Sequence, residues 1–373
     1  MNPIGISGAI AQIGLILSCE KPLPNMAKRF YIQKLDAIRG AACLYILLHN
    51  FVYGLYGKEL VSGNLKLLFS AGQEVVIIFF ILSGFVVRLS LERHPKTLFR
   101  TFFVRRFRRI YFPLVITFLV SLAIAALRGK AIEEFSWYDL AGNLLLLQDF
   151  GSVKPGTWFY PFLGNLPLWF LSYEWWFYLM FYPAYKYLPK NNKRIYSIAA
   201  FSILFYAIYV AIPNQIALIL SYFILWWVGV ECAEVFLRDR TFTYRNLQPI
   251  FIGLGLAVVA TSLPLFWLED LKPGYYPFLM FRHFFAAFLG LGVGLIWYRY
   301  RLVGFDLLLG KCAAIAPISY SLYLLSYPIL VQWGLNSFSP KTWFMYVINA
   351  IVLFTLAYLT EIKWQPRVNR CIK

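Results

Sequence analysis

The sequence predicts an all-α membrane protein, a polytopic bundle of about ten transmembrane helices with both termini in the cytoplasm. Two observations lead to this fold class. Of the 373 residues, 60% are hydrophobic and only 14% are charged, whereas soluble domains are about half apolar and about a quarter charged. The mean hydropathy of +0.64 indicates lipid as the solvent for most of the chain. No polar stretch is long enough for a separate soluble domain, which excludes a soluble enzyme with one membrane anchor.

Long apolar runs, separated by basic or Gly- and Pro-rich breaks, give the positions of the helices, because a span needs about 20 apolar residues. The runs lie near residues 38–56, 68–90, 110–127, 167–188, 196–212, 214–236, 249–267, 276–298, 312–334 and 342–363. The fifth and sixth are separated by Ile212-Pro213-Asn214, which we interpret as a tight hairpin. The longest connection, 128–166, contains the short apolar stretch Leu144–Leu147 and is expected to form a half-helix or an interfacial segment over the outer face.

The net charge of +18 supports the orientation and gives no indication of nucleic-acid binding. With the N-terminus in the cytoplasm, 27 of the 35 Lys and Arg residues fall in cytoplasmic connections, 7 in outer ones, and Arg282 lies inside a span. Cytoplasmic connections of membrane proteins carry an excess of positive charge. The asymmetry therefore predicts an even number of spans and a multi-pass protein of the cytoplasmic (inner) membrane.

The first 25 residues match no element of this pattern. They lack the basic start of a signal peptide, and we expect translation to begin at Met26, with a lipoprotein-like cleavage before Cys19 as the alternative. Residues 26–373 are then one transmembrane domain. The five cysteines and three histidines are too scattered for a disulfide framework or a local metal motif.

Ionisable residues inside spans are functional candidates, because their burial in lipid is costly. In the first span Arg39 lies at the cytoplasmic end and His49 about 15 Å deeper, at about 1.5 Å per residue. The imidazole is a candidate proton acceptor between a cytoplasmic donor and an outer acceptor. Asp36, three residues before Arg39, is expected to form an ion pair that orients it.

The other charged spans leave alternatives open. Glu174 could pair with Arg282 or accept a hydrogen bond from a substrate hydroxyl. Glu74 could pair with Arg39 or with Arg282, in a structural or a catalytic role. His283 is expected to be a packed, hydrogen-bonded histidine, with a fallback role as the base, whereas His94 lies in a cytoplasmic loop and has no specific role.

A cluster of four arginines precedes the third span: Arg105, Arg106, Arg108 and Arg109. Guanidinium groups bind phosphates through bidentate hydrogen bonds, so the cluster is a candidate site for a phosphorylated cytoplasmic ligand. The alternative is a topology signal that contacts anionic lipid head groups.

Five segments, in order, resemble the acyltransferase-3 family of integral membrane O-acyltransferases from about residue 33 to 363. They are LDAIRG, FFILSGFVV, FVRRFRRIYFP, PLWFLSYEWWFYL and SYSLYLLSYP. The resemblance implies a ten-span bundle that moves an acyl group, commonly acetyl, from cytoplasmic acyl-coenzyme A to a hydroxyl of a glycan or lipid-linked sugar. It implies no bound cofactor and no metal, with acyl-coenzyme A as co-substrate.

The resemblance also assigns roles to residues. His49, Arg39 and Glu174 would be catalytic, and the arginine cluster would hold the coenzyme A phosphates. The possible supporting residues are Asp36, Asn50, Glu74, Ser83, Arg282 and His283. By the resemblance, the histidine deprotonates the acceptor hydroxyl or first helps to relay the acyl group across the membrane.

The chain departs from the family at two positions. The family has its histidine eleven residues after the arginine, where this chain has Asn50, and His49 comes one residue early. Ten residues at about 100° each leave His49 about 80° from the face of Arg39. Either a local helix irregularity brings His49 into place, or the base is lost. The second departure is Ser326, where relatives carry histidine.

The sequence thus predicts an O-acyltransferase of an extracytoplasmic sugar hydroxyl. Two alternatives remain: a transporter or flippase of a polar lipid or sugar, and a non-catalytic family relative marked by Asn50. The acceptor, the length of the acyl group and the oligomeric state do not follow from the sequence.

Overall fold

The computed structural model describes residues 25–371 except 57–62, 94–96, 190, 192, 269–270, 273 and 335–343. Within these residues the fold is all-α. The β-type pairing among them is a single isolated bridge between Gln148 and Phe159. The long helices are α2 (Asn25–Tyr56), α4 (Gly72–Arg93), α5 (Phe99–Leu127), α8 (Trp169–Tyr187), α9 (Arg194–Ala211), α11 (Phe223–Asp239), α12 (Tyr244–Ser262), α13 (Phe278–Arg299) and α16 (Phe344–Tyr358).

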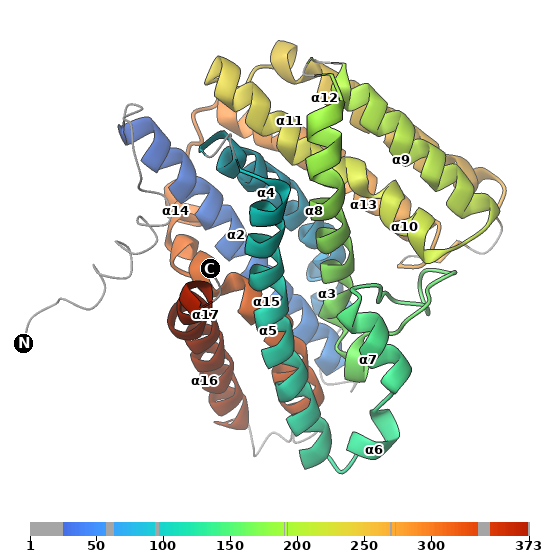
Figure 1. Ribbon diagram of the computed structural model, residues 1–373, viewed down its shortest axis with the longest axis vertical. Helices are drawn as coiled ribbons and strands as arrows, with labels where there is room; N and C mark the ends of the chain where they lie inside the picture. The colour runs from blue at the N-terminus through green and yellow to red at the C-terminus, as the bar shows by residue number, and fades with distance from the viewer. Residues whose placement is uncertain are drawn as a thin grey trace, which may run out of the picture.

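Shorter helical elements connect and extend them (Figure 1). They are α3 (Gly63–Leu68), α6 (Ala131–Glu134), α7 (Trp137–Leu144), η1 (Phe162–Gly164), η2 (Leu166–Leu168), α10 (Gln215–Ser221), η3 (Leu263–Phe266), α14 (Phe305–Leu308), η4 (Gly310–Ala314), η5 (Ala316–Ile318), α15 (Ser319–Ser326), η6 (Tyr327–Gly334), η9 (Leu359–Trp364) and α17 (Gln365–Cys371). Elements η6 and η9 are π-helical.

Eight helical stretches in the described part of the chain are long and apolar enough to cross a membrane. They coincide with eight of the ten expected spans, which confirms the prediction of a multi-pass all-α membrane protein. The other two expected spans are α8, and α15 continued by η6. Helix α8 has a lower mean hydropathy than these eight stretches, because it is rich in Trp and Tyr, whose rings carry a polar tip. Elements α15 and η6 have eight residues each.

Several boundaries differ from the prediction. Helix α2 begins earlier than expected, at Asn25. Helix α5 begins at Phe99, so the arginine cluster lies inside this helix and not before it. The sixth span is divided into α10 and α11 at Tyr222. In the 128–166 connection α7 ends at Leu144, and the chain then turns inward and buries Leu146. The stretch expected to lie over the outer face is therefore partly enclosed by the protein.

The crossing of α4 and α11 depends on two glycines. A Cβ at Gly84 would lie 2.1 Å from the carbonyl oxygen of Trp226, and one at Gly229 would lie 1.9 Å from that of Ile81. Because small residues allow the backbones of membrane helices to approach closely, this crossing brings α4 deep into the bundle. Both cavities described below are lined in part by α4.

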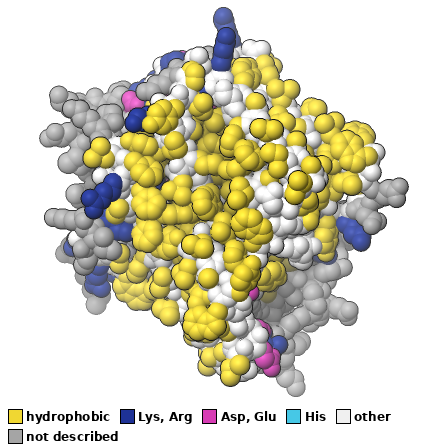
Figure 2. Space-filling model, turned by 45° about the vertical axis from the view of Figure 1, so that its right-hand side comes forward, with side chains coloured by type: hydrophobic (Ala, Val, Ile, Leu, Met, Phe, Trp, Pro, Cys, Tyr) yellow, Lys and Arg dark blue, Asp and Glu magenta, His cyan; other side chains and the backbone are white. Residues whose placement is uncertain are grey.

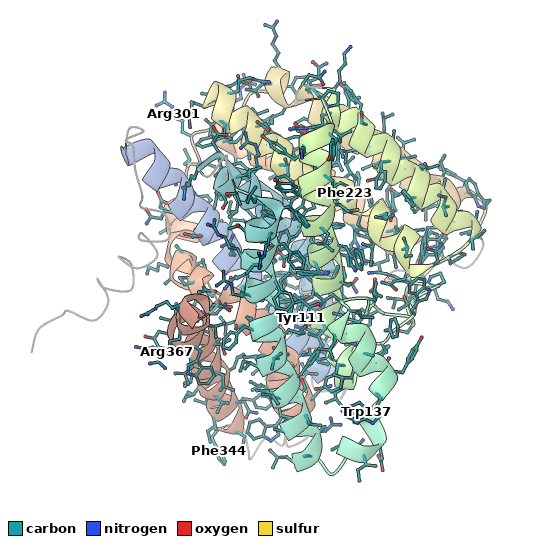
Figure 3. All side chains as sticks on the ribbon, viewed as in Figure 1. Tyr111, Trp137, Phe223, Arg301, Phe344 and Arg367 are labelled. Carbon is teal, nitrogen blue, oxygen red and sulfur yellow. The ribbon has the colours of Figure 1, made fainter. Side chains whose placement is uncertain are left out.

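The surface of the bundle is apolar. Figure 2 shows a face covered largely by hydrophobic side chains, with Lys and Arg near its margins. Exposed apolar residues follow α13, including Phe285, Leu289, Val293 and Ile296. Figure 3 shows Arg301 and Trp137 near opposite ends of the bundle. Such a continuous apolar face fits contact with lipid and not with water.

Candidate functional site

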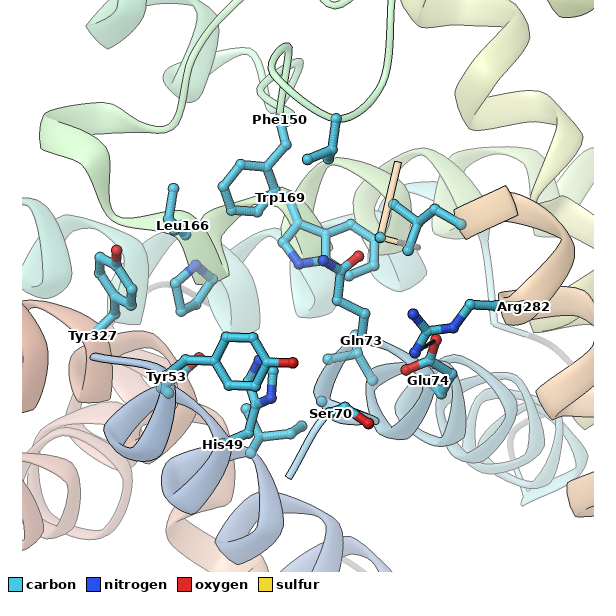
Figure 4. Close-up of a pocket in the computed structure, with 18 of the residues that line it drawn as sticks. His49, Tyr53, Ser70, Gln73, Glu74, Phe150, Leu166, Trp169, Arg282 and Tyr327 are labelled. Atoms are coloured by element: carbon cyan, nitrogen blue, oxygen red, sulfur yellow. Dashed lines mark ion pairs between the residues drawn. The ribbon is translucent and has the colours of Figure 1, made fainter. Parts of the chain in front are cut away.

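A large cavity of about 980 Å³ lies between α2, α4, α13, the η6 segment and the 150–167 part of the long connection. Figure 4 shows His49 and Tyr53 on one side, the Glu74–Arg282 pair on the other, and Gln73 between them. Aromatic side chains make up much of the remaining wall: Phe150, Tyr160, Trp169, Tyr275, Phe278, Tyr323 and Tyr327. We call this space the large cavity.

His49 is held in one orientation in the large cavity. Its Nδ1 lies 2.5 Å from the carbonyl oxygen of Phe69. Because a carbonyl oxygen only accepts hydrogen bonds, Nδ1 carries a proton, and in the neutral imidazole Nε2 then holds the free lone pair. The ring of Tyr53 lies 4.4 Å from the imidazole, centroid to centroid. A Cβ at Gly72 would lie 2.3 Å from the His49 ring, so only glycine leaves room for it.

The register of α2 needs no helix irregularity. Helix α2 runs unbroken through Arg39, His49 and Asn50, and both His49 and Asn50 line the large cavity. Of the two alternatives left open by the sequence, the one that requires a local helix irregularity is wrong, because His49 faces the cavity from a continuous helix. The cavity is wide enough for the side chains at two adjacent positions of the helix to face it. The buried Nδ2 of Asn50 has no hydrogen-bond partner within the described residues.

The charged wall of the large cavity is an ion pair between α4 and α13. Nη2 of Arg282 lies 2.7 Å from Oε1 of Glu74. Of the alternatives left open by the sequence, Glu74 therefore pairs with Arg282 and not with Arg39. This pair also removes Arg282 as a partner for Glu174.

A small cavity of about 150 Å³ lies further along the same helices. It contains four of the predicted charged residues, Arg39, Arg106, Arg109 and Glu174. Its lining consists of Arg39, Val76, Phe79, Ser83, Val86, Arg106, Arg109, Phe170, Glu174, Tyr178, Ser319, Tyr320 and Tyr323. Val76 and Tyr323 line both cavities, so the two spaces meet at these side chains.

Glu174 is a hydrogen-bond acceptor in the small cavity. Its Oε1 accepts from Ser83 Oγ at 2.8 Å and from the Tyr178 hydroxyl at 2.6 Å. Both donors are fixed on helices, Ser83 on α4 and Tyr178 one turn after Glu174 on α8. The carboxylate is thus oriented by protein groups, and the sequence-based alternative of a pairing with Arg282 is wrong.

Arg39 lies beside these groups and is oriented from its own helix. Its Nη1 is 3.9 Å from Oδ1 of Asp36, which confirms the expected pair three residues apart.

The four arginines of the cluster point in different directions, because they lie on successive positions of helix α5. Arg106 and Arg109 line the small cavity. Arg109 is paired with Glu361 of η9, which also accepts a hydrogen bond from Ser321 Oγ at 2.8 Å. Arg108 instead donates to the backbone carbonyl of Asn369 at 3.0 Å.

Arg105, the fourth member, is exposed. Two of the four arginines therefore face the cavity, one contacts the C-terminal helix α17, and one faces outward.

A buried network that the sequence did not indicate fixes the long connection. Asp149 and Lys154 are fully buried, and Lys154 Nζ lies 3.1 Å from both carboxylate oxygens. The Tyr173 hydroxyl donates to Asp149 Oδ2 at 2.5 Å. Burial lowers the pKa of Lys154, and the charge of Asp149 opposes this shift. The only signal in the sequence was an acid and a base five residues apart in an aromatic loop.

His283 belongs to the same region and not to the cavity wall. It is fully buried, and its Nδ1 lies 2.8 Å from the Tyr222 hydroxyl. Its ring stacks on Trp169, which separates it from the large cavity. The expectation of a packed, hydrogen-bonded histidine is confirmed. His94 lies outside the described residues.

In the described part of the chain, no three His, Cys, Asp or Glu side chains are grouped so that they could hold a metal ion.

Comparisons with known proteins find similarity to acyltransferases. The profile of a family described as an acyltransferase domain matches residues 32–362. The acyltransferase MdmB of Streptomyces mycarofaciens is 32% identical over 170 residues, which are 44% of this chain and 41% of that protein. The match thus spans about two fifths of the length of this curated relative. No solved structure matches the chain.

Proposed function

This chain belongs to the acyltransferase family whose profile spans residues 32–362, and from this premise we propose that it is a membrane-embedded O-acyltransferase. Its donor is acyl-coenzyme A, acetyl in the first instance, bound from the cytoplasm. Its acceptor is a hydroxyl of an extracytoplasmic glycan or lipid-linked sugar, and the protein resides in the cytoplasmic (inner) membrane.

Charge and size support the assignment of the donor to the small cavity. Arg39, Arg106 and Arg109 line it, and guanidinium groups suit an anionic thioester donor. Its volume of about 150 Å³ is below the roughly 300–1,000 Å³ of pockets that hold a whole small molecule. The small cavity therefore takes the acyl end of the donor, and the phosphate groups stay at its cytoplasmic mouth.

The large cavity suits the acceptor. Its volume of about 980 Å³ is at the upper end of the range for small-molecule sites. Tyr53, Tyr160 and Trp169 offer rings that pack on the apolar face of a sugar. Gln73, Asn50 and the Glu74–Arg282 pair offer partners for its hydroxyl groups.

The reaction follows from the tautomer of His49. Nε2 accepts the proton of the acceptor hydroxyl while the oxygen bonds to the thioester carbonyl carbon. The carbonyl electron pair moves to its oxygen and returns as the carbon–sulfur bond breaks. The coenzyme A thiolate then receives the proton from His49, which leaves an ester, a free thiol and a neutral imidazole. Phe69, through its carbonyl, keeps Nε2 as the basic nitrogen in each cycle.

One observation carries the proposal: a single helix, α2, presents an oriented imidazole to the large cavity and an arginine to the small one. The test uses the full chain in lipid nanodiscs, with acetyl-coenzyme A and a glycan extract. We expect release of coenzyme A thiol and acetylation of the glycan. His49→Ala should lower the rate about 10²- to 10⁴-fold, the usual contribution of a general base.

Asn50→His is the matched control for the register. If His49 is the base, Asn50→His leaves the rate near that of the wild type. An inactive wild type that gains activity through Asn50→His would instead identify a non-catalytic relative. Flux of a polar lipid or sugar across vesicles without coenzyme A would favour the transporter.

A further inference from the structure

Four helical elements line both cavities: α2, α4, α15 with its continuation η6, and α8, which presents Trp169 to the large cavity and Phe170 to the small one. Helix α2 presents Arg39 to the small cavity and His49 to the large one. Helix α4 presents Ser83 and Phe79 to the small cavity and Gln73 and Glu74 to the large one. The two cavities are therefore consecutive parts of one path along the bundle.

Element α15 and its continuation η6 follow the same path. Tyr320 faces the small cavity, Tyr323 faces both, and Tyr327 and Val331 face the large cavity. These positions recur every three or four residues, so they form one helical face.

Val76 and Tyr323 stand where the path is interrupted. Both are almost completely buried, at 3% and 5% exposure, and each lines both cavities. Tyr323 is held from the side of the small cavity by Phe79 and Phe170, with ring centroids 6.3 and 5.7 Å away. A ring that packs against two other rings is restricted in its rotamers.

We propose that Val76 and Tyr323 form a wall that determines the length of the acyl group transferred. The inference rests on the proposed function, because it concerns the passage of the acyl end of the donor toward His49. The thioester carbonyl must meet the acceptor oxygen at this wall. A short acyl chain fits beside these side chains, whereas each added methylene must displace Val76 or the Tyr323 ring.

The wall also keeps the two substrates on their own sides until the acyl group is in place. The donor approaches along the arginines and the acceptor along the aromatic residues of the large cavity. Removal of the two methyl groups of Val76 widens the passage between the cavities and leaves the packed rings of Phe79, Phe170 and Tyr323 in place.

The experiment compares acetyl-, propionyl- and butyryl-coenzyme A with the full chain in nanodiscs and a glycan extract. The readout is kcat/KM for thiol release with each donor. We expect Val76→Ala to raise the butyryl-to-acetyl ratio about tenfold or more, since one methylene in an apolar pocket changes the ratio about 10- to 200-fold. A gain with the longer donor cannot arise from partial unfolding.

Val331→Ala is the matched control, because the same atoms are removed from the large cavity away from the wall. It should keep the wild-type ratio, and Val76→Phe should lower transfer of all three groups, most of all butyryl. If the wild type transfers acyl groups but Val76→Ala keeps the wild-type ratio, the wall assignment is wrong. If the wild type uses none of the three donors, the proposed function fails, and the inference fails with it.

Discussion

Replacement of Gly72 by alanine tests the placement of His49 without altering any group that could react. The added Cβ would lie 2.3 Å from Cδ2 of His49, whereas carbon atoms in contact are about 3.5–4.0 Å apart. The imidazole must therefore move by about 1 Å or more. This movement breaks its 2.5 Å contact with the Phe69 carbonyl oxygen, which selects the tautomer.

A misplacement of about 1 Å in a catalytic group costs about 100-fold in rate. We therefore expect Gly72→Ala to lower kcat for coenzyme A release about 100-fold. Gly63→Ala is the control, because Gly63 lines the same cavity and a Cβ there meets nothing within 4 Å. It should retain wild-type kcat. If Gly72→Ala is as active as Gly63→Ala, the orientation of His49 is unimportant and the assignment of the base is wrong.

Three further changes test other parts of the structure. Lys154→Met leaves Asp149 buried without its cation and should lower the free energy of unfolding by about 3–5 kcal/mol, measured by thermal unfolding. The Asp149→Asn, Lys154→Met double variant should recover part of this loss. Equal unfolding temperatures for the wild type and the single variant would contradict the role of this network. Gly84→Ala forces α4 away from α11 and should cost about 1–3 kcal/mol, whereas Gly294→Ala, where a Cβ meets nothing within 4 Å, should not. Arg106→Ala removes a guanidinium from the small cavity and should raise KM for acyl-coenzyme A about tenfold or more, while Arg105→Ala, on an exposed residue, should change it less; equal effects of the two would refute the division of the cluster.

The positions of the helices could be predicted from the sequence because hydropathy is a local property. Eight of the ten expected spans coincide with helical stretches able to cross a membrane. The interruption at Tyr222 could not be predicted, because the 214–236 run is continuously apolar. The turn there depends on packing against other helices, as in the hydrogen bond from the Ile224 amide to Ser202 Oγ of α9.

The members of the site could be predicted more easily than their partners. Arg39, Glu74, Glu174 and Arg282 were noticeable because charges in apolar runs are rare. Their pairing was not predictable, since it depends on how each helix is rotated: α4 directs Glu74 to Arg282, and Glu174 faces Ser83 instead.

Two further features could not be predicted: the depth at which a loop residue is buried and the width of the cavity. The burial of Lys154 could not be inferred, because loop composition carries no information about depth. The sequence left open whether His49 reaches the site, because helical geometry gives the angle of a residue but not the width of the space it faces.

The most direct test of the central claim is mass spectrometry of the surface glycans of the source cells. A deletion strain would be compared with strains complemented by the wild type and by His49→Ala. The account predicts an acyl ester on the glycan with the wild type and its loss in the deletion strain and with His49→Ala. The same glycan acylation in all three strains would contradict it.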